Sequence, residues 1–343
     1  MNRRPAMLVA LAAALSLGLV GCSSTPETPA PSSSEPAPET SSEQPEPTES
    51  ESEAPAEPAE ITIGALPISE TAPLWAAAAN GVFEEHGFKV TIQPIQGGAQ
   101  AMPALLNGEV DFLVGQPFGA LRASLQGLDV KIISNYAESY ATGDDINAVV
   151  AGPDSGISSP KDLAGKRVAV NSLGAAGDLT IMEAVAADGG DPSTIEFVEV
   201  AFPDAAAQIE AKNIDAAWVP EPFVSMIVGA GGSKVVYPYQ ATLPGLPTLV
   251  VQTTGAKLTE DAELVSSFRA ALQAVFDWGA ENDDALRASL VAEMNLPEPA
   301  AAGLPLPHFT TTLDKGVIQG LADLAIEHKF FDAAPDLDAL IVE

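Results

Sequence analysis

Apolar and polar residues follow two alternating patterns along the chain from Ile61 onward. Short apolar runs, typical of buried strands, are followed by longer stretches whose apolar positions recur every three or four residues, typical of helices. Gly108 ends one such helix. Strands are predicted at 61–65, 89–94, 110–114 and 130–134, and helices at 72–83, 99–107 and 117–126. This order predicts parallel strands joined by crossover helices.

The same order of elements returns after residue 150. Ser159 and Pro160 predict the start of a short helix that Gly165 ends. Residues 107–114 (NGEVDFLV) also resemble residues 212–219 (KNIDAAWV), so we predict two lobes of like topology and no short-period solenoid. Strands are predicted at 167–170, 195–200, 216–219 and 234–237, and helices at 178–188, 203–212 and 221–229.

Two further strand-like segments, 146–151 and 248–252, lie between the lobes in sequence, and we predict that they are crossover strands forming a hinge. Thr259 is the expected N-cap of a helix that packs back onto the first lobe. A loop at 297–307 and a last amphipathic helix at 313–329 complete the chain. The apolar face of the helix after Thr259 comprises Leu264, Phe268, Ala271, Leu272, Val275 and Phe276.

The predicted architecture is therefore α/β with two lobes. Lobe 1 comprises residues 61–147 and 248–343, and lobe 2 comprises residues 148–247. Ligands of open α/β sheets bind at the carboxyl ends of strands, and we expect these ends to face each other across a cleft between the lobes. A hinge would let the lobes close on a ligand and exclude water.

The N-terminus predicts export. Arg3 and Arg4 precede an apolar run at 6–20 that has the length of a signal peptide and is too short for a membrane span. The sequence LVGC at 19–22 resembles the lipobox of bacterial lipoproteins, which implies a signal peptide at 1–21 and a lipid on Cys22. A plain secretory signal with a chance cysteine is the alternative. The twin arginines match a Tat signal only weakly.

Residues 22–60 predict a lipidated cysteine followed by a tether. The segment is rich in Ser, Thr, Pro, Glu and Ala and has no Lys or Arg, so it cannot bury enough apolar surface to fold. Two or more acyl chains give durable anchoring. We expect the folded part to be held at the outer face of the cytoplasmic membrane. Cys22 is the only cysteine, which excludes an internal disulfide.

Charge and motif content exclude several classes of function. The formal net charge of −32 would repel phosphate backbones, so no nucleic-acid partner is expected. The three histidines, His86, His308 and His328, are far apart in sequence and lack metal-ligand spacing. The chain has no Gly-x-Ser-x-Gly elbow and no Walker loop. We therefore expect no catalytic residue, no metal and no cofactor, and a protein that is not an enzyme.

Four stretches resemble type II periplasmic binding proteins, and most closely the group that binds nitrate, sulfonates, taurine and thiamine-pyrimidine precursors. They are residues 66–88 (LPISETAPLWAAAANGVFEEHGF), 104–112 (ALLNGEVDF), 159–170 (SPKDLAGKRVAV) and 215–223 (DAAWVPEPF). No single stretch is diagnostic, but their order and spacing are. The resemblance implies a monomeric receptor that captures a small molecule for an ABC importer with a separate permease and ATPase.

The resemblance also implies which loops touch the ligand. In lobe 1 the positions are Pro67, Ser69, Thr71, Gly97, Gly98 and Gln116, and in lobe 2 they are Asn171, Ser172, Gly174, Ala175, Trp218 and Glu221. Several of them have a structural alternative: a tight turn for Gly97 and Gly98, turn positions for Asn171 and Ser172, a core position for Trp218, and a helix cap or a lysine partner for Glu221. The residues at 171–177 precede a helix, whose free N–H groups would suit an anion.

The chemistry of the ligand stays open at this point. The range of ligands in the resembled group slightly favours a sulfonate-, nitrate- or taurine-like anion, yet the expected loops contain no Arg or Lys. Nearby acidic residues would instead suit an amine or an aminopyrimidine; they are Glu70, Glu138, Asp178, Asp204 and Glu221. A sensor or adhesion lipoprotein of the same fold is a further alternative. Eukaryotic pyrimidine-precursor synthases of this fold carry a cysteine-rich segment that this chain lacks.

Overall fold

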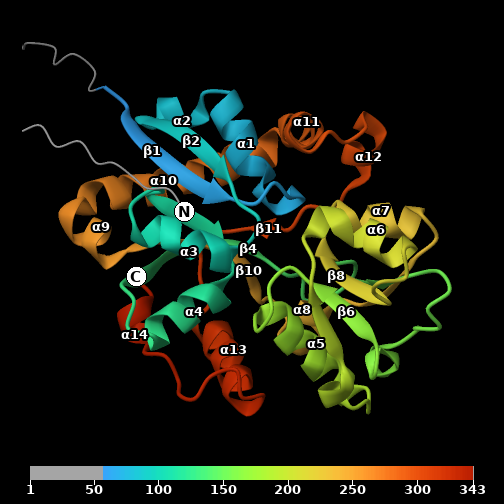
Figure 1. Ribbon diagram of the computed structural model, residues 1–343. Helices are drawn as coiled ribbons and strands as arrows, with labels where there is room; N and C mark the ends of the chain where they lie inside the picture. The colour runs from blue at the N-terminus through green and yellow to red at the C-terminus, as the bar shows by residue number, and fades with distance from the viewer. Residues whose placement is uncertain (1–56, 343) are drawn as a thin grey trace, which may run out of the picture. The chain divides into compact units, whose positions relative to one another are not determined.

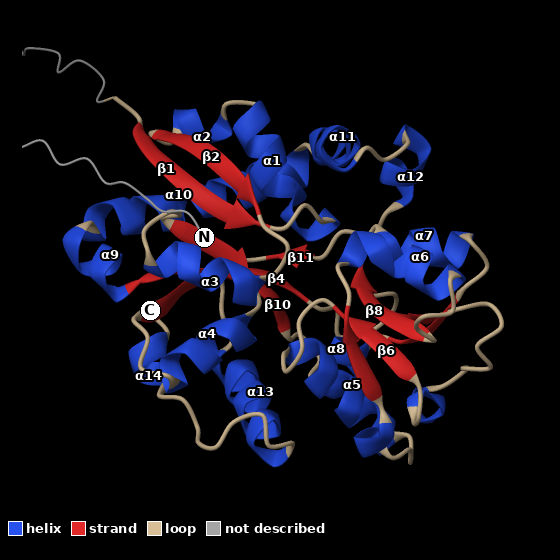
Figure 2. Ribbon diagram, in the orientation of Figure 1, coloured by secondary structure: helices blue, strands red, loops and turns tan. Residues whose placement is uncertain are grey.

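A computed structural model describes residues 57–342, without the side chains of residues 98–100. The predicted signal peptide, Cys22 and most of the predicted tether lie outside these residues. The described part contains two sheets with helices packed around each (Figures 1 and 2). None of its helices has both the length and the apolar character that crossing a membrane requires.

The first sheet, with its helices, forms lobe 1. Its strand order is β11-β4-β10-β3-β1-β2, in which β1 is parallel to β2 and β3, and β10 is antiparallel to β3 and β4. The strands are β1 (Ala59–Ala65), β2 (Phe88–Pro94), β3 (Phe112–Gly115), β4 (Val130–Glu138), β10 (Pro247–Thr254) and β11 (His308–Phe309). The first helices are α1 (Ala72–Ala79), α2 (Val82–Glu85), α3 (Gly98–Leu106) and α4 (Pro117–Leu125).

The second sheet forms lobe 2 and repeats this plan. Its order is β7-β6-β8-β5-β9, with β6 parallel to β7 and β8, and β5 antiparallel to β8 and β9. The strands are β5 (Asn147–Ala151), β6 (Arg167–Val170), β7 (Glu196–Glu199), β8 (Ala216–Pro220) and β9 (Ser233–Val236). The helices are α5 (Ala176–Ala187), α6 (Ala205–Glu210), α7 (Phe223–Gly229) and α8 (Pro238–Thr242).

The two sheets correspond strand for strand. The order β2-β1-β3-β10-β4 of lobe 1 matches β7-β6-β8-β5-β9 of lobe 2, and in each the fourth strand is antiparallel. That fourth strand follows directly after the chain has arrived from the other lobe. The prediction of two lobes of like topology is confirmed, and the parallel strands predicted by the alternation form the first three positions of each sheet.

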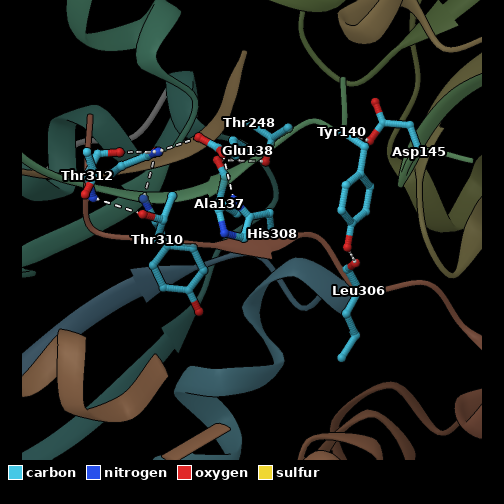
Figure 3. A network of polar contacts seen from close by, with 11 residues as sticks. Ala137, Glu138, Tyr140, Asp145, Thr248, Leu306, His308, Thr310 and Thr312 are labelled. Carbon is cyan, nitrogen blue, oxygen red and sulfur yellow. Dashed lines mark hydrogen bonds and ion pairs between the residues drawn. The ribbon is translucent and has the colours of Figure 1, made fainter. Parts of the chain in front are cut away.

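The chain passes between the sheets at residues 139–146 and 237–246. At the first crossing the end of β4 pairs with β11, and the Glu138 carboxylate lies 2.7 Å from Nδ1 of His308 (Figure 3). The Tyr140 hydroxyl then donates to the Leu306 carbonyl at 2.8 Å, and the Tyr140 N–H donates to Asp145 at 3.2 Å. This crossing is therefore held to the C-terminal part of the chain by hydrogen bonds.

The C-terminal helices pack mainly on lobe 1. Phe268 on α10 is fully buried and stacks on Phe112 of β3 at 4.0 Å between ring centroids, with Phe83 and Phe88 close by, so this helix packs onto the first lobe as predicted. The helices are α9 (Gly255–Glu260), α10 (Ala262–Glu281), α11 (Asp283–Met294), α12 (Glu298–Gly303), α13 (Lys315–Glu327) and α14 (Leu337–Leu340).

Several predicted boundaries were wrong. The helix at 72–83 is interrupted at Gly81, whose φ of 74° is left-handed, so α1 and α2 are separate. Thr259 is not an N-cap but lies inside α9, where its hydroxyl donates to Gly255; Thr254 caps that helix. The loop at 297–307 contains α12. The sequence pattern did not predict α11, because only Leu286, Ser289 and Leu290 of that helix are buried.

Candidate functional site

A pocket of about 290 Å³ lies between the two sheets and receives residues from both. From lobe 1 it is lined by Leu66, Ile68, Glu70, Met102, Pro103, Leu106, Gln116, Phe118, Gly119, Arg122, Ala123, Gln126, Leu128, Thr248 and Leu249. From lobe 2 it is lined by Asn147, Asn171, Ser172, Gly174, Ala175, Phe202, Trp218, Pro220 and Tyr239.

Several polar residues of the lining follow parallel strands at their carboxyl ends or lie near such an end. The loop after β1 contributes Glu70 and the residue after β3 is Gln116, while the loop after β6 contributes Asn171 and β8 contributes Trp218. In parallel sheets these ends share one edge, and here the edges of the two lobes meet at one pocket. The pocket is close to the lower end of the usual size of small-molecule sites, which is about 300–1,000 Å³.

A buried carboxyl group, that of Glu70, lies in this pocket. Glu70 is 2% exposed, and its side chain accepts a 3.4 Å hydrogen bond from the Asn147 amide of lobe 2. Burial raises the pKa of Glu70 to about 7, against the lowering effect of hydrogen bonds from Thr248 and Asn147; the charge of Asp145 raises it further. Within residues 57–342 no basic side chain forms an ion pair with Glu70, so the ionised form of its carboxyl group has no positively charged partner in that part of the chain.

Two buried donors in the pocket have no hydrogen-bond partner within the described part of the chain. They are Nε1 of Trp218, a residue 2% exposed, and the hydroxyl of Tyr239, a residue 1% exposed. Burial raises the pKa of Tyr239 well above its ordinary value, so the hydroxyl keeps its proton at neutral pH. An unpaired buried donor costs about 1–3 kcal/mol, which a ligand with a suitably placed acceptor would recover.

One cation, Arg122, also lines the pocket, on α4. Its guanidinium lies over the ring of Phe118 at 5.3 Å and donates to the Gly174 carbonyl of lobe 2. The first turn of α4 faces the pocket as well, since Gln116 is the N-cap and Gly119 lines the cavity, and no side chain caps this helix. Its free N–H groups and Arg122 give this part of the pocket positive potential.

The N-terminus of α5 differs from what the sequence suggested. Asp178 in its first turn accepts the N–H groups of Gly174 and Ala175, at 2.5 and 2.7 Å. Those two donors are therefore occupied by the protein's own carboxylate and are not free for an anion. Burial raises the pKa of Asp178, against these backbone hydrogen bonds and the charge of Arg122.

The structure brings half of the predicted ligand residues to the pocket. Those that line it are Gln116, Asn171, Ser172, Gly174, Ala175 and Trp218. Gly97 lies at its edge, because a Cβ added there would be 3.6 Å from Nδ2 of Asn171 on the other lobe. Gly98 begins α3, and its surroundings lie outside what the structure describes.

The other four predicted positions do not line the pocket and have structural roles. The Ser69 hydroxyl donates to the Glu221 carbonyl at 3.2 Å, and the Thr71 hydroxyl donates to carbonyls of its own loop, including Ile68 at 2.9 Å. The Glu221 carboxylate accepts from the N–H and hydroxyl of Ser225, so it caps α7. Pro67 is half-buried in the same loop as Ser69.

Sequence reasoning did not place Asn147, Tyr239 and Arg122 among the ligand residues, and it named Glu70 only as a nearby acid that would suit an amine. For Arg122 a signal existed, because Gly119, Arg122, Ala123 and Gln126 recur at helical spacing and all line the pocket. What distinguishes Glu70 from the other acids named from the sequence is its burial inside the pocket. Asn147 follows the first crossing and Tyr239 lies within the second, and no local pattern specifies the path of these crossings between the lobes. Within residues 57–342 no group of His, Cys, Asp and Glu could hold a metal ion.

Comparisons with known proteins agree with this architecture. The alkanesulfonate-binding protein SsuA from Xanthomonas axonopodis pv. citri, bound to MOPS, is 19% identical with a TM-score of 0.71, over 84% of this chain and 100% of that one. The nitrate-binding protein NrtA from Synechocystis PCC 6803 is 14% identical with a TM-score of 0.69, over 83% and 86%. The desulfurization enzyme DSZB is 14% identical with a TM-score of 0.59, over 82% and 95%.

At these identities the likeness concerns the fold, which is that of type II periplasmic binding proteins. A search of curated proteins gave no match. The family model described as "NMT1/THI5 like" matches residues 68–285, which is well over half of the chain and includes both crossings between the lobes. The chain therefore belongs to the NMT1/THI5-like family.

Proposed function

We propose that this protein is the solute-binding component of an ABC importer, which captures a small molecule between its lobes and delivers it to a membrane permease. The observation that carries the proposal is the pocket between two matching sheets, with a buried acid and two unpartnered donors inside it. Membership of the NMT1/THI5-like family and the fold shared with SsuA and NrtA support it.

The ligand that fits this pocket best carries both a hydrogen-bond donor and an acceptor. Glu70 requires a donor or a cation, whereas Trp218 and Tyr239 require an acceptor. An amine-bearing molecule or an aminopyrimidine meets both requirements, and the aromatic rings around the pocket can cover a planar ligand. The initial preference for an anion is supported only in part, by Arg122 and the start of α4. A taurine-like compound would place its amine at Glu70 and its sulfonate at Arg122 and the start of α4.

The binding role fits the site better than catalysis does. The desulfurization enzyme DSZB has a similar fold, so the fold alone does not distinguish a binding protein from an enzyme. Among the described residues, the Glu70 carboxyl group interacts with the Asn147 amide and the Thr248 hydroxyl, and no His or Lys that could activate this hydroxyl is among these partners. A reaction would need such a group held in geometry beside the substrate. We propose a receptor with no catalytic residue.

Attachment and partners form the rest of the proposal. The lipobox-like residues 19–22 support a lipid on Cys22, a tether over the following residues and a location at the outer face of the cytoplasmic membrane. A permease and its ATPase would be the protein partners of a monomeric receptor. A sensor or adhesion lipoprotein would share the pocket but not the transporter.

Binding and transport are tested by two measurements. A thermal-shift screen should include amines, aminopyrimidines, taurine, alkanesulfonates and nitrate, because a ligand at 100 times its Kd stabilises the folded state by about 2.7 kcal/mol. Uptake of the labelled ligand by cells that lack the gene then separates an importer from a sensor. Binding without any loss of uptake would contradict the transport role.

A further inference from the structure

The C-terminal helix α13 contacts both lobes outside the ligand pocket. It packs against α4 of lobe 1 through a buried face formed by Ile318, Leu321, Ala322 and Ala325. At its end, Nε2 of His328 lies 2.8 Å from Oε2 of Glu183, which is on α5 of lobe 2. The two side chains are 13% and 32% exposed, so the contact is partly shielded from water.

The turn after α13 directs two aromatic rings toward the pocket wall. Lys329 adopts a left-handed φ of 62°, and the N–H groups of Phe330 and Phe331 both donate to the Ala325 carbonyl. Phe331 thereby stacks on Phe118 at 4.7 Å between centroids, while Phe330 meets the same ring edge-on. Phe118 lines the pocket, so this turn packs directly against one of its walls.

A second connection to lobe 2 continues through that wall. Arg122 lies over the ring of Phe118 and donates to the Gly174 carbonyl, in the loop that also carries Asn171 and Ser172. Gly320 of α13 also approaches Leu243 in the second crossing, because a Cβ added at Gly320 would be 3.1 Å from that side chain. One segment of the chain therefore touches lobe 1, lobe 2 and the connection between them.

We propose that residues 315–331 act as a strap that sets the spacing of the two lobes, with His328 and Phe331 as positioning residues for the pocket. His328 contacts α5 directly through Glu183. Phe331 packs on Phe118, whose ring lies under Arg122, and Arg122 in turn donates to the Gly174 carbonyl of lobe 2. The strap holds both walls of the pocket, although none of its residues is among those that line it. This inference goes beyond the proposed function and concerns the free protein.

The test measures the distance between the lobes in the absence of ligand. Spin labels are attached at two exposed positions, Glu109→Cys in lobe 1 and Ala186→Cys in lobe 2, in the full chain with Cys22→Ser. Double electron–electron resonance then measures the distance between the two labels. Glu183→Gln or His328→Gln should shift the population toward longer distances by roughly threefold to tenfold, the value of one partly shielded hydrogen bond to a carboxylate. The double variant should add little to either single one, and His328→Lys, which keeps a donor next to Glu183, should keep the short wild-type distance.

The control is Lys315→Gln, which removes an ion pair between α13 and Asp338 of α14 without contact to lobe 2. Phe331→Leu should lengthen the distance like His328→Gln, with a folded chain verified by circular dichroism. Distance distributions that are identical in wild type, Lys315→Gln and all strap variants would overturn the proposal. Because no ligand is present, that result leaves the receptor role to be judged by the binding screen alone.

Discussion

Nδ2 of Asn147 lies 3.4 Å from Oε1 of Glu70, and this hydrogen bond joins the first residue of β5 in lobe 2 to the loop after β1 in lobe 1. The contact places an amide donor of one lobe on a buried acid of the other, inside the pocket. This hydrogen bond forms only when the two lobes are close together, so Glu70 interacts with both lobes and with the pocket.

Glu70→Gln is expected to change how stability depends on pH. The pKa of Glu70 rises from 4.5 to about 7 on folding, so the folded state holds the proton more tightly than the unfolded chain. The resulting stabilisation is complete below pH 4.5 and is lost as pH rises through about 7, up to about 3 kcal/mol in total. Urea unfolding at pH 5 and pH 8 should therefore show a smaller fall for Glu70→Gln than for wild type.

The matched control for that experiment is Glu84→Gln, which removes the same charge from an exposed position on α2. Its stability should follow the wild-type pH dependence. Equal pH dependence of wild type and Glu70→Gln would show that the acid is not buried as described.

Trp218→Phe should weaken ligand binding by roughly tenfold, because it removes the Nε1 donor but keeps an aromatic ring in the pocket. Isothermal titration with the best compound from the screen measures the effect. Trp218→Ala is a poor substitute: the ring is 2% exposed and packs on Phe202 and Tyr239, so its loss should cost about 3–5 kcal/mol of stability. Unchanged affinity in Trp218→Phe would remove this residue from the site.

Asn171→Ala should lower ligand affinity by roughly fivefold to tenfold with little effect on thermal stability, since the side chain lines the pocket and is half-buried. Glu221→Gln should leave affinity unchanged, because the Glu221 carboxylate caps α7 through Ser225 instead of lining the pocket. The reverse outcome, with only Glu221→Gln affecting the ligand, would mean that the ligand binds elsewhere.

Phe268→Ala should destabilise the chain by about 3–5 kcal/mol in urea unfolding, because a fully buried ring stacked on Phe112 is removed. Phe268→Leu keeps most of the volume and should cost clearly less. A small effect of Phe268→Ala would contradict the packing of α10 on the first sheet.

Much of the fold follows from local sequence patterns. Short β-branched runs and amphipathic stretches predict most of the strands and most of the longer helices of the two lobes, and the recurrence of residues 107–114 at 212–219 predicts their likeness. The failures are local: the left-handed Gly81 divides one predicted helix, and α12 lies where prolines suggested a loop. Neither α11 nor the cap at Thr254 has a strong pattern, because packing and a single side-chain hydrogen bond decide them.

The candidate site was harder to predict, because its polar groups differ in what they bond to. Asn171 and Gln116 follow strands and reach the pocket, whereas Ser69 and Glu221 also follow strands but bond to other parts of the protein. Asp178 caps its own helix and occupies donors that the sequence offered to a ligand. Such choices depend on distances across the lobes, which no local pattern contains.

The most direct test of a solute site between the lobes is a blocked pocket. Gly119 lines the cavity on α4, and a Cβ added there meets nothing closer than Met102 at 3.9 Å, so Gly119→Leu should fill the pocket and keep the fold. Gly229→Leu, at the open end of α7, is the matched control. In thermal-shift titrations, the ligand should raise the Tm of wild type and Gly229→Leu but not of Gly119→Leu. An equal rise in all three proteins would contradict the proposed binding site.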